Sequence, residues 1–443
     1  MSAAASLRPR RLQRGDLLPR VVGELPGPRS REASALFAEL EAPGINTLYG
    51  GAPNLVWQEA LGSCVLDLDG NRFLDFTSGF GVAAVGHRHP RVVAAVREQS
   101  KKLVHGLGDA IGHPGRLALA ARLRALAPWP EQARAQVYFA VSGADAVEIA
   151  LKTALLSRRG RSRVAVFEPS YHGLSLGALA ATSRPVFRDP FKAHLHREIS
   201  RFPFGRPLGS LRHELESGRF AAVLVEPAVG REGALFPPAG WLAELAEICR
   251  ATGTLLVCDE IFTGFGRCGH IFASAGEGVV PDLICCGKAL GGGLPIAAVL
   301  APAAILAAWA TPGEALHTGT FVAHPLACAA ALAALSVIED EGLAERARRL
   351  GEEIAPRLAN WLEHQALAAV RGRGLFFGLE FESRDLAGRF QAAAWQNGVL
   401  LLAGGPDGKV AQLAPCLNIA RRQLDAALVA LERALLATDR VRP

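Results

Sequence analysis

Two residues of opposite charge stand at the ends of two short apolar runs in the middle of the chain. The run Leu255–Cys258 leads directly into Asp259, and the run Leu283–Cys286 is followed, after one glycine, by Lys288. Short apolar runs bounded by turn residues are typical of interior strands of a parallel sheet. Because ligands bind outside the carboxyl ends of such strands, we expect the aspartate and the lysine to meet at a ligand site.

An amine and a carboxylate at one sheet edge suit a pyridoxal 5'-phosphate site. The amine of Lys288 would form the Schiff base, and Asp259 would keep the pyridine nitrogen protonated so that the ring accepts electrons. Two other interpretations of this pair stay open from these residues alone: a buried Asp–Lys ion pair, and two unrelated surface charges. Since the chain has only six lysines, a strand-end lysine followed by a glycine run is distinctive.

A second segment predicts where a phosphate group would bind. The sequence VSGADAVEIALKTA follows an expected strand and opens an expected helix. Its residues Ser142, Gly143 and Ala144 would present backbone N–H groups at the helix N-terminus, where a phosphate dianion is held well. The alternative is an ordinary helix cap without a ligand.

Strands and helices are expected to alternate through the middle of the chain. The apolar runs predict strands at 136–141, 163–167, 221–225, 255–258, 283–286 and 296–301. Helical periodicity is found at 90–102, 114–126, from 144 onward, and at 240–251 and 325–341. This alternation favours an α/β fold with a mainly parallel sheet flanked by helices.

The two ends of the chain have a different pattern. A hairpin turn is predicted at Asp69–Gly70, strands at 372–382 and 398–402, and a closing helix at 421–437. We therefore expect an N-terminal basic tail, with a short helix at 31–41, over residues 1–42. The rest divides into an N-terminal part of a small domain (43–90), a large domain (91–330) and a C-terminal small domain (331–443).

Composition excludes several classes of function. Half of the 443 residues are hydrophobic and a fifth are charged, as in soluble globular proteins. Most of the net charge of +6 lies within residues 1–20, in Arg8, Arg10, Arg11, Arg14 and Arg20, so the charge gives little support for a nucleic-acid partner. The uncharged, mainly apolar stretch Leu294–Ala310 is too short for a membrane span and contains two prolines.

The cysteines indicate the compartment. None of the eight stands in a CxxC pair, which predicts free thiols in a reducing environment, without disulfides or a metal site. We expect a cytoplasmic protein. The Arg-rich, acid-poor start leaves an organellar transit peptide as the alternative.

From about Gly62 to near its C-terminus, the chain resembles the class III (ω-type) aminotransferases, which are fold-type I pyridoxal phosphate enzymes. DEIFTGFGRCG is similar to the aspartate segment of that family and CCGKALGGGLPIAAV to its lysine segment, and the separation of Asp259 and Lys288 also fits. The resemblance implies a large, mainly parallel mixed-sheet domain flanked by helices. It also implies a smaller α/β domain built from the C-terminus with N-terminal contributions.

The resemblance also implies roles for further residues. Residues 142–144 match the segment on the cofactor phosphate, Tyr171 matches the aromatic residue that stacks on the pyridine ring with His172 beside it, and Glu226 matches a glutamate near that ring. Thr320 matches a threonine that reaches the phosphate of the neighbouring subunit's cofactor. The expected assembly is therefore a homodimer with a shared active site, or a tetramer built from such dimers.

Four positions depart from the family pattern. Leu174 and Gln412 stand where amino-acid-specific members often have arginine, so a substrate carboxylate loses at each place a charge-assisted partner worth about 1.5–3 kcal/mol. Arg231 replaces a glutamate and Phe262 a glutamine. Our hypothesis is that Arg231 binds the substrate carboxylate while Leu174 lines an apolar or amine-binding side. The alternative is a solvated surface arginine.

The resemblance implies a pyridoxal-phosphate-dependent aminotransferase. The donor would be a primary amine, namely a diamine, an ω-amino acid or a related biosynthetic intermediate, and the acceptor a 2-oxo acid such as 2-oxoglutarate or pyruvate. Lys288 would act as general base and acid. One alternative is a decarboxylase, racemase, epimerase or aminomutase of the same fold. A more remote one is a non-catalytic binding protein that retains the fold.

Overall fold

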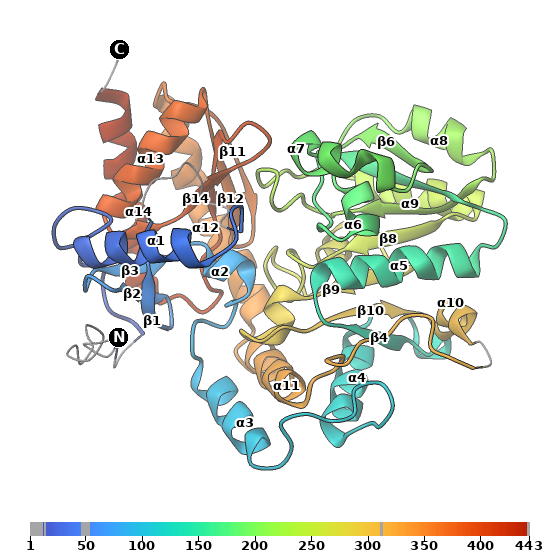
Figure 1. The fold of residues 1–443 in the computed structure, drawn as a ribbon. Coiled ribbons are helices and arrows are strands. Elements are labelled where there is room, and N and C mark those ends of the chain that lie inside the picture. Colours follow the sequence, from blue (N-terminus) through green and yellow to red (C-terminus); the bar gives the residue numbers. More distant parts are fainter. Residues whose placement is uncertain (1–11, 13–14, 46–53, 311–312, 441–443) are drawn as a thin grey trace.

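A seven-stranded mixed sheet forms the centre of the protein, as a computed structural model that describes residues 12, 15–45, 54–310 and 313–440 shows (Figure 1). Its strand order is β4-β10-β9-β8-β7-β5-β6. Strand β10 is antiparallel to both of its neighbours, and the pairs from β9 to β6 are parallel. The predicted α/β fold class is confirmed. The strands are β4 (Gln136–Ala140), β5 (Arg163–Glu168), β6 (Ile199–Pro203), β7 (Phe220–Val225), β8 (Leu255–Asp259), β9 (Leu283–Cys286) and β10 (Ala297–Ala301).

Helices cover both faces of this sheet because its strands are apolar on both sides. Every residue of β7 is buried. Ala222 and Leu224 pack into the core under α5, whereas Val223 and Val225 pack into the core under α8 and α9. The helices of this part of the chain are α5 (Gly143–Ser157), α6 (Leu176–Ala181), α7 (Pro185–Arg188), α8 (Gly209–Leu215), α9 (Trp241–Thr252) and α10 (Ala303–Leu306).

A second group of helices covers the face of β4 and β10 that is opposite α5. Helix α11 (Pro325–Asp340) contacts α3 (Pro90–Ser100) and α4 (Pro114–Leu126), and all three lie together at the bottom of Figure 1. Short 3-10 helices interrupt the loops at Glu131–Ala133, Asp189–His194, Ala273–Glu277, Lys288–Gly291, Ala307–Trp309 and Trp361–Glu363.

Two four-stranded sheets lie beside the central one. The first has the order β1-β2-β3-β13 and joins β1 (Trp57–Leu61), β2 (Cys64–Asp67) and β3 (Arg72–Asp75) to β13 (Val399–Leu400). Strand β13 pairs in parallel with β3, so segments near the two ends of the chain lie side by side. The second sheet is antiparallel and contains β11 (Leu367–Arg373), β12 (Phe376–Phe381), β15 (Val410–Leu413) and β14 (Leu402–Gly404).

Four of the remaining helices lie with these smaller sheets, namely α1 (Pro28–Leu40), α12 (Leu343–Asn360), α13 (Arg384–Gln396) and α14 (Arg421–Arg440). The short helix α2 (Ser78–Gly81) contacts the turn Lys288–Gly291. The predicted hairpin turn at Asp69–Gly70 is confirmed, because β2 and β3 are antiparallel and Gly70 has a φ of 86°.

Two strand predictions in the C-terminal part were wrong. Residues 372–382 do not form one strand, because the chain turns at Gly374, with a φ of 58°, between β11 and β12. Residues 398–402 divide between β13 and β14, which belong to different sheets. Strand β6 was not predicted, and the helix expected from Arg31 begins at Pro28.

The start of the described chain is held by the body of the protein. Gln423 Nε2 donates to the carbonyl oxygens of Gly15 and Leu17, at 3.0 and 2.9 Å. The arginines expected to form a basic tail, at positions 8, 10, 11 and 14, lie outside the described residues. In the described part of the chain, no helix combines the length and the apolarity needed to cross a membrane.

Candidate active site

A cavity of about 380 Å³ opens at the carboxyl ends of the parallel strands. Residues 142–144, from the start of α5, and residues 171–175, after β5, form part of its wall. Residues 226 and 231, after β7, residues 259, 261 and 262, at the end of β8, and residue 288, after β9, complete it. The alternation of strand and helix therefore brings five separate segments to one edge of the sheet.

Asp259 ends β8 as a buried carboxylate with fixed hydrogen bonds. Its Oδ2 lies 2.8 Å from His172 Nδ1, and its Oδ1 accepts from the backbone N–H of Ile261 at 3.1 Å. The His172 backbone N–H donates to the hydroxyl of Thr182, which holds the imidazole in place. Among the described residues, His172 Nε2 is buried without a hydrogen-bond partner.

The loop that follows Asp259 is held by a second buried carboxylate. Glu260 accepts from the backbone N–H groups of Ala273 and Ser274, at 2.9 and 2.8 Å, and from the hydroxyl of Thr263. Burial raises the pKa of Glu260, whereas these three hydrogen bonds favour its charged form. Glu260 faces away from the cavity and positions the loop that carries Ile261 and Phe262.

Lys288 follows β9 in a strained backbone conformation. Its φ is +42°, which is unusual for a residue with a side chain. Its Nζ lies 4.5 Å from the centre of the Phe262 ring. Lys288 and Asp259 both line the cavity, yet no ion pair joins these two described residues, since Asp259 is paired with His172. The simple buried ion pair that the sequence left open is therefore absent.

The cavity changes the proton affinity of Lys288. Burial lowers its pKa to about 8, and the nearby carboxylates of Asp259 and Glu226 only partly offset this effect. A fraction of the amine is therefore neutral near physiological pH. Only the neutral amine has the lone pair needed to attack a carbonyl carbon.

Glu226 is a buried carboxylate whose two oxygens hold two loops. Oε1 accepts from the backbone N–H of Tyr171 and Oε2 from that of Gly230, both at 2.9 Å. Burial raises the pKa of Glu226 to about 7, and the charge of Asp259 acts in the same direction. Glu226 thus fixes the segment with Tyr171 relative to the loop with Arg231.

The start of α5 has the geometry of an anion site. Ser142 is the N-cap and accepts through Oγ from the backbone N–H of Asp145 at 3.2 Å. The first-turn N–H groups of a helix have no partner within the helix, and its dipole favours a negative charge there. Gly173 packs so closely on this turn that an added Cβ would lie 2.6 Å from Ala144 Cβ.

Arg231 lies in the cavity and is stacked on aromatic rings. Its guanidinium carbon is 4.5 Å from the centre of the Tyr171 ring and 5.3 Å from that of Phe187. The residue is partly buried. The structure therefore places Arg231 at the wall of the cavity that contains Lys288, where Leu174 also lies, half exposed.

Two residues named from the sequence lie outside this cavity. Thr320 is exposed, and its carbonyl oxygen lies against Gly108. Gln412, on β15, donates through Nε2 to the carbonyl oxygen of Gly230 at 2.6 Å, so it supports the loop with Arg231 from behind. The structure brings together the other predicted site residues but not these two.

Sequence reasoning did not identify several residues of the site. Gly173, Ser175 and Ile261 line the cavity, and Phe187 stacks on Arg231. Gly173 follows Tyr171 by two residues in the chain, and Phe187 follows it by sixteen. Gly173 could have been recognised from its position near Tyr171, the expected stacking residue. No sequence pattern indicated Phe187 or Ser175.

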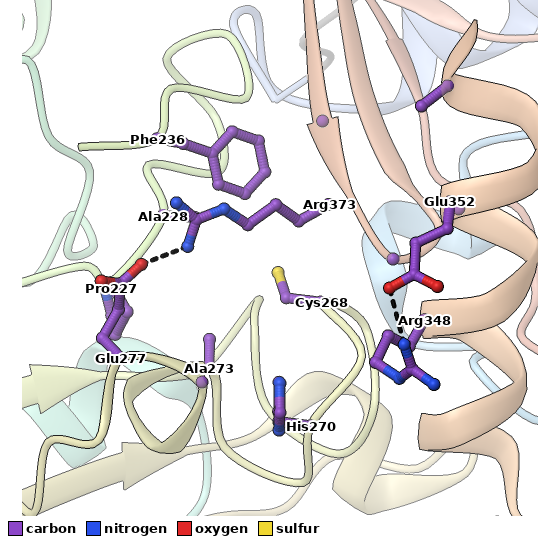
Figure 2. Close-up of a pocket in the computed structure, with 15 residues that line it drawn as sticks. Pro227, Ala228, Phe236, Cys268, His270, Ala273, Glu277, Arg348, Glu352 and Arg373 are labelled. Atoms are coloured by element: carbon purple, nitrogen blue, oxygen red, sulfur yellow. Dashed lines mark hydrogen bonds and ion pairs between the residues drawn. The ribbon is translucent and has the colours of Figure 1, made fainter. Parts of the chain in front are cut away.

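A second cavity, of about 290 Å³, lies between the loop 268–277 and the helix α12 (Figure 2). Its charged side chains pair with one another: Arg373 reaches Glu277, and Arg348 pairs with Glu352. Because these charges are already neutralised and no predicted site residue lies here, the first cavity is the better candidate for chemistry. In the described part of the chain, no group of three or more side chains could hold a metal ion.

The residues of the first cavity fit pyridoxal phosphate. A helix N-terminus with small residues suits the phosphate, and a lysine with a lowered pKa suits the covalent bond. A buried carboxylate, itself oriented by His172, suits a protonated pyridine nitrogen. The cavity volume is in the range of cofactor pockets.

Comparison with known proteins identifies the family. The family model for class-III aminotransferases matches residues 49–435. The acetylornithine aminotransferase of Mycobacterium tuberculosis is 39% identical over 383 residues, which cover 86% of this chain and 92% of that protein.

Solved structures agree with this assignment. The ornithine aminotransferase of Toxoplasma gondii superposes with a TM-score of 0.84 at 29% identity, covering 92% of this chain and 95% of that one. A PLP-bound amine transaminase from an uncultivated Pseudomonas species gives a TM-score of 0.82 at 29% identity, covering 90% and 99%. The chain therefore belongs to the class-III aminotransferases, pyridoxal-phosphate-dependent enzymes of fold type I.

Proposed function

We propose that the donor of this aminotransferase is a primary amine, namely a diamine, an ω-amino acid or a related biosynthetic intermediate. The acceptor is a 2-oxo acid. The observation that carries the proposal is that Lys288, Asp259 and the start of α5 line one cavity. The names of the relatives, which include acetylornithine, ornithine and amine transaminases, support a donor amine remote from a carboxylate.

Bound pyridoxal phosphate supplies the electron sink and carries the amino group between two half-reactions. In the first, the donor C–N bond is replaced by a C=O bond whose oxygen comes from water. In the second, the acceptor carbonyl oxygen leaves as water while a new C–N bond forms. Lys288 would hold the cofactor through Nζ until the donor amine takes its place. The freed Nζ would carry the proton from the nitrogen-bearing carbon of the donor to the cofactor and, in the second half-reaction, from the cofactor to the acceptor carbon.

The other residues of the cavity position these groups. Asp259 would hold a proton on the pyridine nitrogen, and His172 keeps the Asp259 carboxylate in place through its 2.8 Å contact. Tyr171 would lie against the ring, while Ser142, Gly143 and Ala144 would hold the phosphate. Glu226 fixes the Tyr171 segment by accepting its backbone N–H.

The proposed assembly is a homodimer in which Thr320 contributes to the partner's phosphate site. Two observations support this proposal. Thr320 is exposed and does not line the cavity of its own chain. Phe321 beside it is 59% exposed, so this segment offers apolar surface that a partner subunit could cover. Assembly of such dimers into a tetramer would leave this shared site unchanged.

The proposed location is the cytoplasm. All eight cysteines are buried and free in the structure. A protein with this many unpaired thiols suits a reducing compartment.

An absorbance titration of the purified protein tests the proposed reaction. We expect a band near ~410–430 nm that Lys288→Ala abolishes. A donor amine should bleach it to ~330 nm, and a 2-oxo acid should restore it. A coloured protein that releases CO2 from its substrate, or inverts it, without this cycle would favour the decarboxylase, racemase, epimerase or aminomutase alternatives. A protein that takes up no pyridoxal phosphate would refute the proposal.

A further inference from the structure

Arg231 belongs to a loop that several contacts hold rigidly over the cavity. The Gly230 backbone N–H donates to Glu226, and the Gly230 carbonyl oxygen accepts from Gln412 at 2.6 Å. Arg371 donates through Nη2 to the carbonyl oxygen of Gly233 at 2.9 Å. The loop is thus fixed on both sides of Arg231, which gives the guanidinium a defined position.

The guanidinium of Arg231 is oriented but has no protein partner for its in-plane donors. The rings of Tyr171 and Phe187, which stand at 72° to each other, restrain the group from two sides without using its N–H donors. The neighbouring carboxylate of Glu232 is taken by Arg184 instead, at 2.8 Å. Within the described ranges, the Arg231 side chain makes neither a hydrogen bond nor an ion pair. A guanidinium with unpaired N–H donors is suited to a carboxylate, which it can bind through two parallel hydrogen bonds.

Among the described lining residues of the cavity, Arg231 is the one arginine and Lys288 the one lysine. Of the other described lining residues, His172 is paired with Asp259 at 2.8 Å, and Leu174 contributes an apolar side chain. Gln412 is occupied by the carbonyl oxygen of Gly230. Position 412 lies directly behind the loop that carries Arg231. An arginine there would repel Arg231, whereas the neutral amide of Gln412 does not. Among the described residues, a second substrate carboxylate would therefore find no further arginine or lysine in this cavity.

We propose that Arg231 is the carboxylate-binding residue of this site, and that it selects a monocarboxylic 2-oxo acid, of the pyruvate type, over a dicarboxylic one. This inference rests on the proposed aminotransferase function. Arg231 is a specificity-determining residue that contacts the acceptor, whereas Lys288 does the proton transfer.

Steady-state kinetics with pyruvate and 2-oxoglutarate test this proposal. We expect the native protein to have the higher kcat/KM with pyruvate. Arg231→Ala should raise KM for pyruvate by about 10- to 100-fold, because a bidentate charge-assisted contact is lost, and should change kcat only a few-fold. Arg231→Lys should recover part of the loss, since an ammonium keeps the charge but not the bidentate geometry.

Two controls separate this inference from the function on which it rests. Arg373→Ala removes another guanidinium that lies over an aromatic ring, 5.5 Å from the centre of Phe236, in the second cavity, and should leave KM unchanged. The bleaching of the Arg231→Ala protein by a carboxylate-free amine such as 1,4-diaminobutane, measured beside the native protein, should change far less than KM for pyruvate does. If the native protein transaminates but Arg231→Ala keeps its KM for pyruvate, or if the native protein prefers 2-oxoglutarate, the inference is wrong. A native protein that transaminates no amine would instead refute the proposed function.

Discussion

Lys288 is subject to two opposing influences. Burial favours the neutral amine, whereas the carboxylates of Asp259 and Glu226 and the face of the Phe262 ring favour the ammonium. The result is a pKa of about 8, compared with about 10.4 for a free lysine. The replacement of the family glutamine by Phe262 places an aromatic face, rather than a polar amide, next to the reactive nitrogen.

This balance predicts how cofactor attachment depends on pH. Because the pKa is lowered, Lys288 is mostly protonated below pH 8 and mostly neutral above it. The rate of covalent attachment of pyridoxal phosphate to the apoprotein should rise about tenfold per pH unit below pH 8 and level off above it. Stopped-flow absorbance between pH 6 and 9.5 measures this rate. A rate still rising steeply at pH 9.5 would show that the cavity does not lower the pKa.

A variant at Phe262 tests the contribution of the ring. Phe262→Leu removes the cation–π contact at 4.5 Å and keeps an apolar side chain, so the ammonium loses stabilisation. We expect the midpoint of the pH profile to move down by about 0.4–1.5 units, since a cation–π contact is worth about 0.5–2 kcal/mol and one pKa unit is about 1.36 kcal/mol. A midpoint that moves upward would mean that the ring does not stabilise the ammonium.

At the scale of elements, the site depends on how closely the segment after β5 packs on the start of α5. Gly173 has a φ of +128°, a conformation that side chains rarely adopt. Its backbone lies so near Ala144 that an added Cβ would be 2.6 Å from Ala144 Cβ and 2.9 Å from its Cα. One glycine therefore sets both the direction of the Tyr171 segment and the position of the proposed phosphate site.

Gly173→Ala should weaken cofactor binding as well as stability. The new methyl group would push the first turn of α5 away from the cavity, so we expect a higher Kd for pyridoxal phosphate and a loss of more than about 1 kcal/mol in the free energy of unfolding. Fluorescence titration and urea unfolding measure these quantities. Gly160→Ala is the matched control, because Gly160 also has a positive φ, of 86°, but open space around it. It should cost only the backbone strain, and equal Kd values for the two variants would contradict the packing argument.

At the scale of the whole molecule, the large sheet supplies the cavity walls and the smaller sheets brace them. Gln412 on β15 and Arg371 on β11 both hold the loop with Arg231, although they lie more than a hundred residues away in the sequence. Strand β13 ties this C-terminal part to β3 near the other end of the chain. The specificity loop is therefore sensitive to how the C-terminal sheet docks on the large one.

The proposed shared site predicts complementation between two defective subunits. Thr320→Ala should raise the Kd for pyridoxal phosphate by about 10-fold or more, because a hydrogen bond to a charged phosphate is lost. In a hybrid dimer of one Thr320→Ala chain and one Lys288→Ala chain, one of the two sites would combine an intact Lys288 with the partner's intact threonine. We expect half of the sites to recover native affinity.

A variant at a neighbouring threonine is the control for the hybrid measurement. Thr318→Ala removes a neighbouring hydroxyl that bonds to Asp109, and its homodimer should bind the cofactor with native affinity. Hybrids that bind no more tightly than the Thr320→Ala homodimer would show that each site is built within one chain.

Much of the fold could be predicted because the apolar runs of the central strands are local signals. Runs such as Leu255–Cys258 and Leu283–Cys286 are buried on both faces, so their burial can be recognised without knowing their neighbours. The same local signal failed at residues 398–402, where two short strands belong to different sheets. Which sheet a two-residue strand joins depends on partners that are distant in sequence.

The chemistry of the site was also largely present in the sequence. Asp259, Lys288 and the helix start at Ser142 follow strands, and parallel strands of one sheet end at a common edge, so their meeting could be inferred from order alone. The fold class, the family and the meeting of these segments could therefore be predicted from the residues alone. Three contacts became clear only in the folded molecule: Asp259 pairs with His172 rather than Lys288, Phe187 lies against Arg231, and Gln412 supports a backbone carbonyl. These are contacts between side chains on separate segments, and they depend on distances and directions that only the packed molecule defines.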